Sequence, residues 1–232
     1  MKLVEYENIG EKVYHEILDN KLDIYVIPKK GFNKFFAFFA TNYGGCDRRF
    51  SLDGKWLDTP AGVAHFLEHK MFDMQSGNAL MFLSANGALP NAFTSSGITA
   101  YHFECTENFD ENLKILLSFV STPYFTKESV KKERGIIAQE IRMGEDSPSR
   151  AVYQNLMKTL YAHNPIRDSV AGTVESIADI TEKTLYDCHK VFYNPSNMVL
   201  CVAGDLDPQK VCDIARKIVE QDAGEVPERD YG

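Results

Sequence analysis

His65-Phe66-Leu67-Glu68-His69 is the stretch of this sequence with the most specific chemical signal. On a helix, with ~100° of rotation per residue, His65 and His69 lie one turn apart on one face, and Glu68 lies beside them. Two imidazoles in this arrangement can chelate one metal ion, and a neighbouring carboxylate can take a proton from a water on that metal. Two unrelated histidines on a polar helix face are the alternative. Glu68 favours the metal site, which then needs a third ligand.

A second helix, predicted to start at Thr126, offers candidates for that ligand. Glu133 and Glu140 are separated by two helical turns and therefore face the same way. They interrupt an otherwise apolar stretch, so at least Glu140 is expected to point into a packed surface. A buried carboxylate without a partner is costly, and metal coordination is one way to satisfy it. Ion pairing with Arg134 or Arg142 is an equally good explanation at this point.

Composition and charge place the chain among ordinary globular proteins. Of its 232 residues, 44% are hydrophobic and 25% are charged, and the net charge of −8 disfavours a nucleic-acid partner. The longest apolar run, residues 35–40, is far shorter than the ~20 residues that span a bilayer, so we expect no membrane partner. The N-terminus lacks the apolar segment of a signal peptide, and the 5 cysteines form no CxxC pair. We therefore expect a cytoplasmic protein with reduced thiols.

Apolar periodicity predicts the main elements. Alternation over residues 22–27 predicts one strand, and the apolar run 35–40 predicts a second strand over residues 35–41; the turn between them suggests a hairpin. Thr59 and Pro60 are typical of a helix start, and we expect that helix to continue to about Phe72. Further strands are predicted at residues 99–105 and 198–203, and further helices over about 113–120 and from Thr126, Ser147, Thr181 and Pro208.

These elements predict a single domain over residues 1–232. No internal repeat or linker divides the chain, and an early pair of strands, a helix layer and returning strands favour the α+β class, with helices on a mixed sheet. The tail from about residue 222 to 232 is polar, and we do not expect it to pack.

The spacing of the motifs resembles that of the pitrilysin, insulin-degrading and mitochondrial-processing peptidase family, in its bacterial branch. The pentapeptide has the inverted H-x-x-E-H form of these zinc metallopeptidases, the inverzincins, and Glu133, Arg134 and Glu140 follow about 70 residues later. Supporting blocks extend the match over about residues 20–208: Asn91-Ala92-Phe93-Thr94-Ser95, Gly172-Thr173, Ser176-Ile177 and Tyr193-Asn194-Pro195-Ser196-Asn197-Met198. The resemblance implies a largely antiparallel sheet covered by helices, and zinc-dependent endopeptidase (hydrolase) activity.

Position by position, the resemblance implies a zinc site with named roles. His65, His69 and Glu140 match the family's zinc ligands, for one Zn²⁺ per chain, and Glu68 matches the general base. Glu133 matches the family's second acid, which supports the zinc-binding helix without binding the metal directly. A ligand set of two histidines and one glutamate suits zinc better than it suits manganese or cobalt.

The resemblance also implies a substrate site and a partner. Asn91 and Ala92 match the family's substrate-binding edge strand, to which an extended peptide substrate adds as a further strand. Without the zinc motif, this stretch would be read as a turn of small residues. Family members comprise two related halves or two associated chains, so an N-terminal zinc-binding domain needs a second half or a homologous partner chain for activity. A non-catalytic binding or assembly subunit is the alternative, which the retained histidines and glutamates disfavour.

Overall fold

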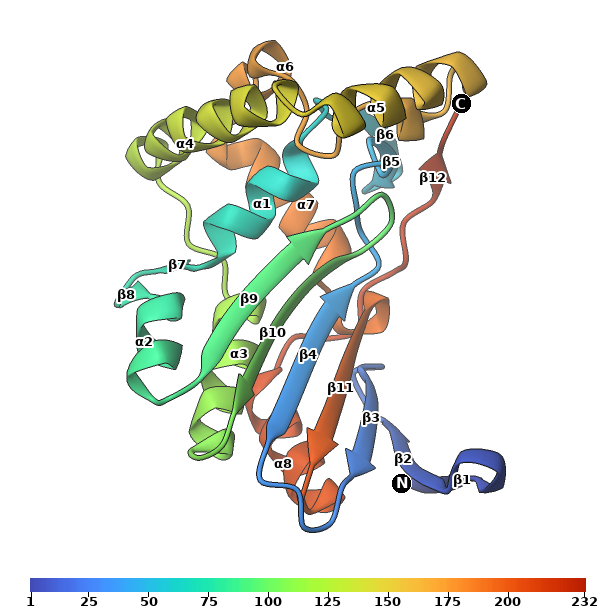
Figure 1. Cartoon of the computed structure of the whole chain (residues 1–232), viewed down its shortest axis with the longest axis vertical. Coiled ribbons are helices and arrows are strands. Elements are labelled where there is room, and N and C mark those ends of the chain that lie inside the picture. Colours follow the sequence, from blue (N-terminus) through green and yellow to red (C-terminus); the bar gives the residue numbers. More distant parts are fainter.

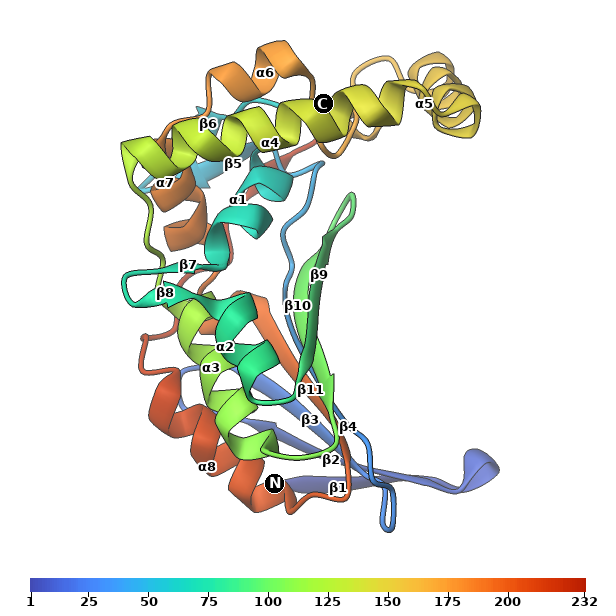
Figure 2. The same ribbon diagram turned by 60° about the vertical axis from the view of Figure 1, so that its left-hand side comes forward.

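A seven-stranded mixed sheet forms the centre of the computed structural model, which describes residues 1–232. Helices cover one of its faces, and the other face carries none (Figure 2). Only one neighbouring pair of strands in this sheet is parallel, so the prediction of an α+β fold with a largely antiparallel sheet is confirmed. In spatial order the strands are β1 (Lys2–Tyr6), β2 (Glu11–Ile17), β3 (Asp23–Pro28), β11 (Met198–Gly204), β4 (Phe35–Thr41), β10 (Thr99–Cys105) and β9 (Leu89–Thr94).

The helices form two groups (Figure 1). Those that cover the sheet are α2 (Ala79–Ala85), α3 (Phe109–Ser121) and α8 (Pro208–Ile218). Those gathered beyond one end of the sheet are α1 (Val63–Met71), α4 (Lys127–Glu145), α6 (Val174–Ala178) and α7 (Glu182–Phe192), and α5 (Pro148–Leu160) continues from the end of α4. Smaller elements are β5 (Arg49–Leu52), β6 (Lys55–Asp58), β7 (Asp73–Met74), β8 (Gly77–Asn78), β12 (Arg229–Asp230) and the short 3-10 turns Glu7–Ile9, Pro165–Arg167 and Pro195–Asn197.

The predicted hairpin of β3 and β4 is wrong, because β11 lies between these two strands. Strand β11 runs parallel to β3 and antiparallel to β4. Its residues Leu200 and Val202 are buried under the helix layer, as the apolar run 198–203 requires. A strand with apolar residues on both faces is better placed in the middle of a sheet than at its edge. The last long strand of the chain therefore enters between two early ones.

Helix α1 begins later than the sequence predicts, at Val63 and not near Thr59. Gly62 precedes it with a φ of 97°, in the left-handed region where side chains are strained. A Cβ at Gly62 would also lie 2.6 Å from the carbonyl oxygen of Ala171. The residues after Pro60 therefore form a tight turn, which sets the direction in which α1 leaves the loop.

The polar tail packs against the domain, contrary to expectation. Strand β12 pairs with β5, and Arg229 and Tyr231 both contact Asp47. Asp47 is only 2% exposed, and a buried carboxylate needs such partners. The tail is therefore held by the buried carboxylate of Asp47, a residue distant in sequence. The local composition of the tail does not reveal this partner.

One hydrophobic core joins the covered face of the sheet to the helices. Phe39 and Tyr101 from the sheet, Leu116 from α3 and Phe66 from α1 are among its fully buried members. The core therefore fixes α1 relative to the sheet end where β9 and β10 lie. None of the helices combines the length and the apolar character needed to cross a membrane.

Candidate metal centre

The two histidines of the pentapeptide and one glutamate of α4 face one another. Phe66 and Leu67 on α1 are fully buried, which leaves His65 and His69 on the side that contacts α4. The Nε2 atom of His65 lies 3.4 Å from one carboxylate oxygen of Glu140, and the Nε2 atom of His69 lies 3.5 Å from the other. One ligand atom from each of these three residues lies within 4.8 Å of the other two. Two imidazole nitrogens and a carboxylate at this separation fit a zinc ion.

The orientation of His69 is fixed by Glu133. The carboxylate of Glu133, on the same face of α4 as Glu140, accepts a hydrogen bond of 3.0 Å from Nδ1 of His69. A histidine that donates from Nδ1 keeps the lone pair of Nε2 free, which is the form that binds a metal. The Nδ1 atom of His65 is buried and has no hydrogen-bond partner in the protein.

The charges around the site favour a positive ion at its centre. Burial lowers the pKa of His69, but the hydrogen bond and charge of Glu133, with Glu68 and Glu140, outweigh it and raise that pKa. Chiefly through its contact with His65, the pKa of Glu140 is lowered. In the metal-free chain this negative field attracts a proton to His69. A divalent cation carries twice the charge of a proton, so the same negative field would attract it more strongly.

Burial of the two acids on α4 differs from the prediction. Glu140, expected to be the buried one, has a side chain that is 43% exposed, whereas that of Glu133 is 17% exposed. Neither acid forms an ion pair with Arg134 or Arg142: their partners are His65 and His69, and Arg134 donates to the carbonyl of Ile180. The stripe of Val130, Ile137 and Ile141 takes up the packed side of α4 and leaves Glu140 at its border. The ion-pair alternative is therefore wrong for both acids.

Glu68 is held by the edge strand of the sheet. Its side chain is largely buried, and one carboxylate oxygen accepts a hydrogen bond of 2.5 Å from the hydroxyl of Thr94, at the end of β9. The hydroxyl of Thr99 lies 3.4 Å from that of Thr94 and is itself bound to the carbonyl of Tyr43. Sequence reasoning missed the role of Thr94, although this residue stands in the block 91–95.

Strand β9 is the edge of the seven-stranded sheet, so its outer side is free to pair. It bonds only to β10, and Asn91 and Ala92 lie at its middle. Asn91 is exposed, and its side-chain oxygen accepts a hydrogen bond of 2.9 Å from the amide of Ala92. The stretch is therefore a strand and not the turn of small residues that its composition suggests. An unpaired edge beside a candidate metal centre is a place where an extended chain can add.

The residues of this site lie in a stretch that matches a known protein family. The model for insulinase, peptidase family M16, matches residues 54–174, which include His65, Glu68, His69, Glu133 and Glu140. The chain belongs to the M16 peptidase family. The model for the M16 peptidase inactive domain matches a second stretch, residues 179–221.

Bacterial zinc proteases are among the sequence relatives of this M16 domain. It is 47% identical to YmfH of Bacillus subtilis, described as an uncharacterized zinc protease, over 94% of this chain and 51% of that protein. It is 28% identical to the zinc protease PqqE of Helicobacter pylori, over 69% of this chain and 37% of that protein. The chain thus spans about half or less of the length of the curated relatives that it matches.

Solved structures show the same M16 fold. The crystal structure of an M16-like peptidase from Alicyclobacillus acidocaldarius matches 98% of this chain and 53% of its own, with a TM-score of 0.90 and 37% identity. Pitrilysin matches 99% of this chain and 26% of its own with a TM-score of 0.83, and at 16% identity it supports the fold alone.

Proposed function

We propose that this chain is the zinc-binding domain of an M16 endopeptidase that hydrolyses peptide bonds of extended peptides. The observation that carries this proposal is the convergence of three elements. Helix α1 supplies two imidazoles and Glu68, α4 supplies Glu140, and the free edge strand β9 reaches Glu68 through Thr94. Candidate metal ligands, a candidate base and an unpaired strand edge thus lie together, which supports the proposal.

His65, His69 and Glu140 would hold one zinc ion. When bound, zinc supplies Lewis-acid chemistry, because it acidifies a coordinated water and polarises a carbonyl. Glu133 would keep His69 in the tautomer that presents Nε2, through the hydrogen bond to Nδ1. Two helices are thus needed to complete the site.

Glu68 would act as the general base. It lies one residue before His69, on the helix that carries both histidine ligands, and the Thr94 hydrogen bond restrains its carboxylate. It would accept a proton from the attacking water and then return a proton to the leaving amine. Only one carboxylate oxygen needs to bind Thr94, which leaves the other for the water.

Strand β9 would bind the substrate by strand addition. A peptide paired with its free edge lies extended, with main-chain hydrogen bonds that do not depend on sequence. The amide of Ala92 is now bonded to the side chain of Asn91, so an incoming carbonyl would replace that contact. Asn91 could then bind the peptide with its own side chain.

Activity on this scheme requires a second half or a homologous partner chain. The sequence relatives named above are about twice as long as this chain or longer. The seven-stranded sheet and α1 give one side of a substrate site, and residues from elsewhere would close the other. A cytoplasmic location of the complete enzyme is part of this proposal, and the five cysteines, all of them free thiols, fit a reducing compartment.

The decisive experiment uses the chain co-expressed with the part of Bacillus subtilis YmfH that it does not match, here called the YmfH complement. Zinc content and cleavage of a fluorogenic peptide are measured for the unchanged chain, for Glu68→Gln and for His65→Ala. We expect one zinc per unchanged chain and none in His65→Ala. Glu68→Gln should keep its zinc but lose about 10²–10⁴-fold in kcat, because the amide cannot take the proton.

Three results would count against this proposal. Rapid turnover by a zinc-loaded Glu68→Gln protein would remove Glu68 from the mechanism. Full zinc retention in His65→Ala would refute the ligand assignment. Zinc binding without cleavage of any peptide would indicate the binding or assembly subunit instead.

A further inference from the structure

Helix α5 turns its apolar side to solvent and its polar side to its own domain. Its apolar side, here called the apolar α5 face, consists of Val152, Tyr153, Leu156 and Leu160, which are 68, 53, 49 and 61% exposed. At ~100° per residue these four residues lie on one side of the helix. Single exposed apolar residues are ordinary, but a continuous stripe on one helix marks an interaction surface.

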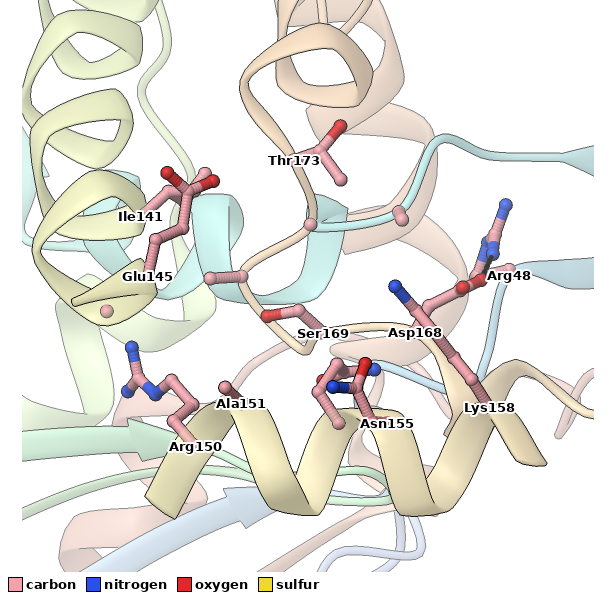
Figure 3. A pocket seen from close by; sticks show the side chains of 15 residues that line it. Arg48, Ile141, Glu145, Arg150, Ala151, Asn155, Lys158, Asp168, Ser169 and Thr173 are labelled. Atoms are coloured by element: carbon pink, nitrogen blue, oxygen red, sulfur yellow. Dashed lines mark hydrogen bonds and ion pairs between the residues drawn. The ribbon is translucent and has the colours of Figure 1, made fainter. Parts of the chain in front are cut away.

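The opposite side of α5 lines a pocket of about 380 Å³ (Figure 3). The pocket lies between α5, the C-terminal end of α4 and the loop 168–173. The residues that α5 contributes include Ala151, Gln154, Asn155 and Lys158, and the last three are polar or charged. Gln154 donates to the carbonyl of Arg167, whose turn follows α5. The domain therefore contacts the polar half of this amphipathic helix.

No residue of α5 is buried, so packing within this domain contributes little to the helix. An isolated helix of 13 residues is marginal in water, and most helices in proteins are stabilised by burial of their apolar face. Here that face has no cover. Stabilisation of α5 by burial of its apolar face therefore requires a surface outside these 232 residues.

We propose that the apolar α5 face binds the second half of a two-half M16 peptidase, an inference that rests on the proposed function. The chain matches only 51% of YmfH and 53% of the Alicyclobacillus structure, so such relatives carry a further part of similar size.

The composition of the apolar α5 face fits a protein partner better than a membrane. It contains no charged residue and includes a tyrosine, as the buried centres of protein interfaces do. Helices that lie on membranes combine an apolar side with lysines and arginines that reach the lipid head groups. On α5, Arg150 and Lys158 line the pocket within the domain.

The test uses the same co-expression with the YmfH complement and measures how much complement co-purifies with the tagged chain. The interface variant is Val152→Glu with Leu156→Glu. The matched control is Ala151→Glu with Asn155→Glu, which adds the same charges at the same spacing on the pocket side. Glutamate is a good helix former, so neither variant should unfold α5, and circular dichroism checks this. Zinc content is measured in every sample.

We expect a 1:1 complex with the unchanged chain and with the control, and at least about ten-fold less complement with the interface variant, because charges at an interface centre oppose association. Unreduced co-purification with the interface variant would overturn the proposal, as would no complex with the unchanged chain. Sedimentation with phosphatidylglycerol vesicles that only the interface variant loses would also overturn it, in favour of a membrane surface. A zinc-free complex that still depends on α5 would refute the proposed function and leave this surface standing.

Discussion

His69 uses its two ring nitrogens for two different acids. Nδ1 donates to Glu133, whereas Nε2 faces Glu140. A ligating imidazole held in this way is more basic and better oriented than a free one. The buried Nδ1 of His65 has no such partner, so of the two candidate ligand histidines only His69 is oriented by an acid, Glu133. The two glutamates of α4 therefore have different roles although they lie on the same face.

This difference predicts an order of effects on zinc affinity. Glu140→Gln should weaken zinc binding strongly, because a neutral amide oxygen is a poor ligand for a dication. Glu133→Gln should weaken it by about 10–100-fold, because the hydrogen bond to Nδ1 becomes weaker while all ligands stay. A competition titration with a chelator of known affinity measures both. The opposite order would exchange the two roles.

Strand β9 connects the free edge of the sheet, the candidate site of peptide pairing, to the candidate base. Asn91 and Ala92 lie at its middle, and Thr94 at its end donates to Glu68. The strand is fixed by its pairing with β10, so Thr94 is a candidate positioning residue on a rigid element. A peptide that added to β9 would meet a strand already bonded to the base.

We expect loss of this hydroxyl to lower kcat and to leave binding almost unchanged. Thr94→Val keeps the β-branched shape, but it removes a hydrogen bond to a carboxylate. Such bonds contribute about 1.5–3 kcal/mol, which corresponds to about 10–100-fold in rate if the bond restrains the base. Thr94→Ser keeps the hydroxyl and should restore activity, and neither variant should change KM or zinc content. Steady-state kinetics of both variants test this. Equal kcat in the valine and serine variants would assign Thr94 a purely structural role.

At the scale of the whole molecule, the buried side chain of His189 connects the two groups of helices. His189 on α7 donates a hydrogen bond of 3.0 Å to the carbonyl of Val120 on α3, and its ring stacks on Tyr193. The hydroxyl of Tyr193 lies 2.8 Å from that of Tyr101 in the sheet. Burial lowers the pKa of His189 from 6.5 to about 4, although the bond to Val120 opposes this shift. The folded chain therefore keeps His189 neutral where the unfolded chain is protonated.

This pKa predicts an acid-sensitive stability. The unfolded chain binds the proton more strongly, so the stabilisation is complete above about pH 6.5 and is lost as the pH falls towards about 4, by at most about 3 kcal/mol. His189→Gln can keep a donor near Val120 but cannot titrate, so its unfolding free energy should fall less over this range. Urea unfolding from pH 7 to pH 4.5 on both proteins measures the difference. Parallel curves would mean that His189 does not control the acid response.

The candidate site was largely predictable from the sequence. The pentapeptide identifies its two histidines and glutamate because helical spacing alone puts them on one side of a single turn. The two-turn spacing of Glu133 and Glu140 likewise indicates a common face. The family resemblance, and not the residues themselves, assigned Glu140 as a zinc ligand and Glu133 as the supporting acid. The exposure of the Glu140 side chain was predicted wrongly. The exposure of Glu140 depends on which face of α4 packs against the core. Contacts with residues outside the helix decide that face.

The sequence by itself determined six of the eight helices, four of the seven strands of the main sheet and the residue types of the site, because these depend on local periodicity and on capping residues such as Thr126 and Thr181. Only the tertiary structure decided that β11 enters between β3 and β4, that the tail packs on Asp47, and that the apolar side of α5 is uncovered. Each of these depends on segments distant in sequence. A local pattern shows which side of an element is apolar, but the surface that covers this side is chosen by the free energy of the whole chain.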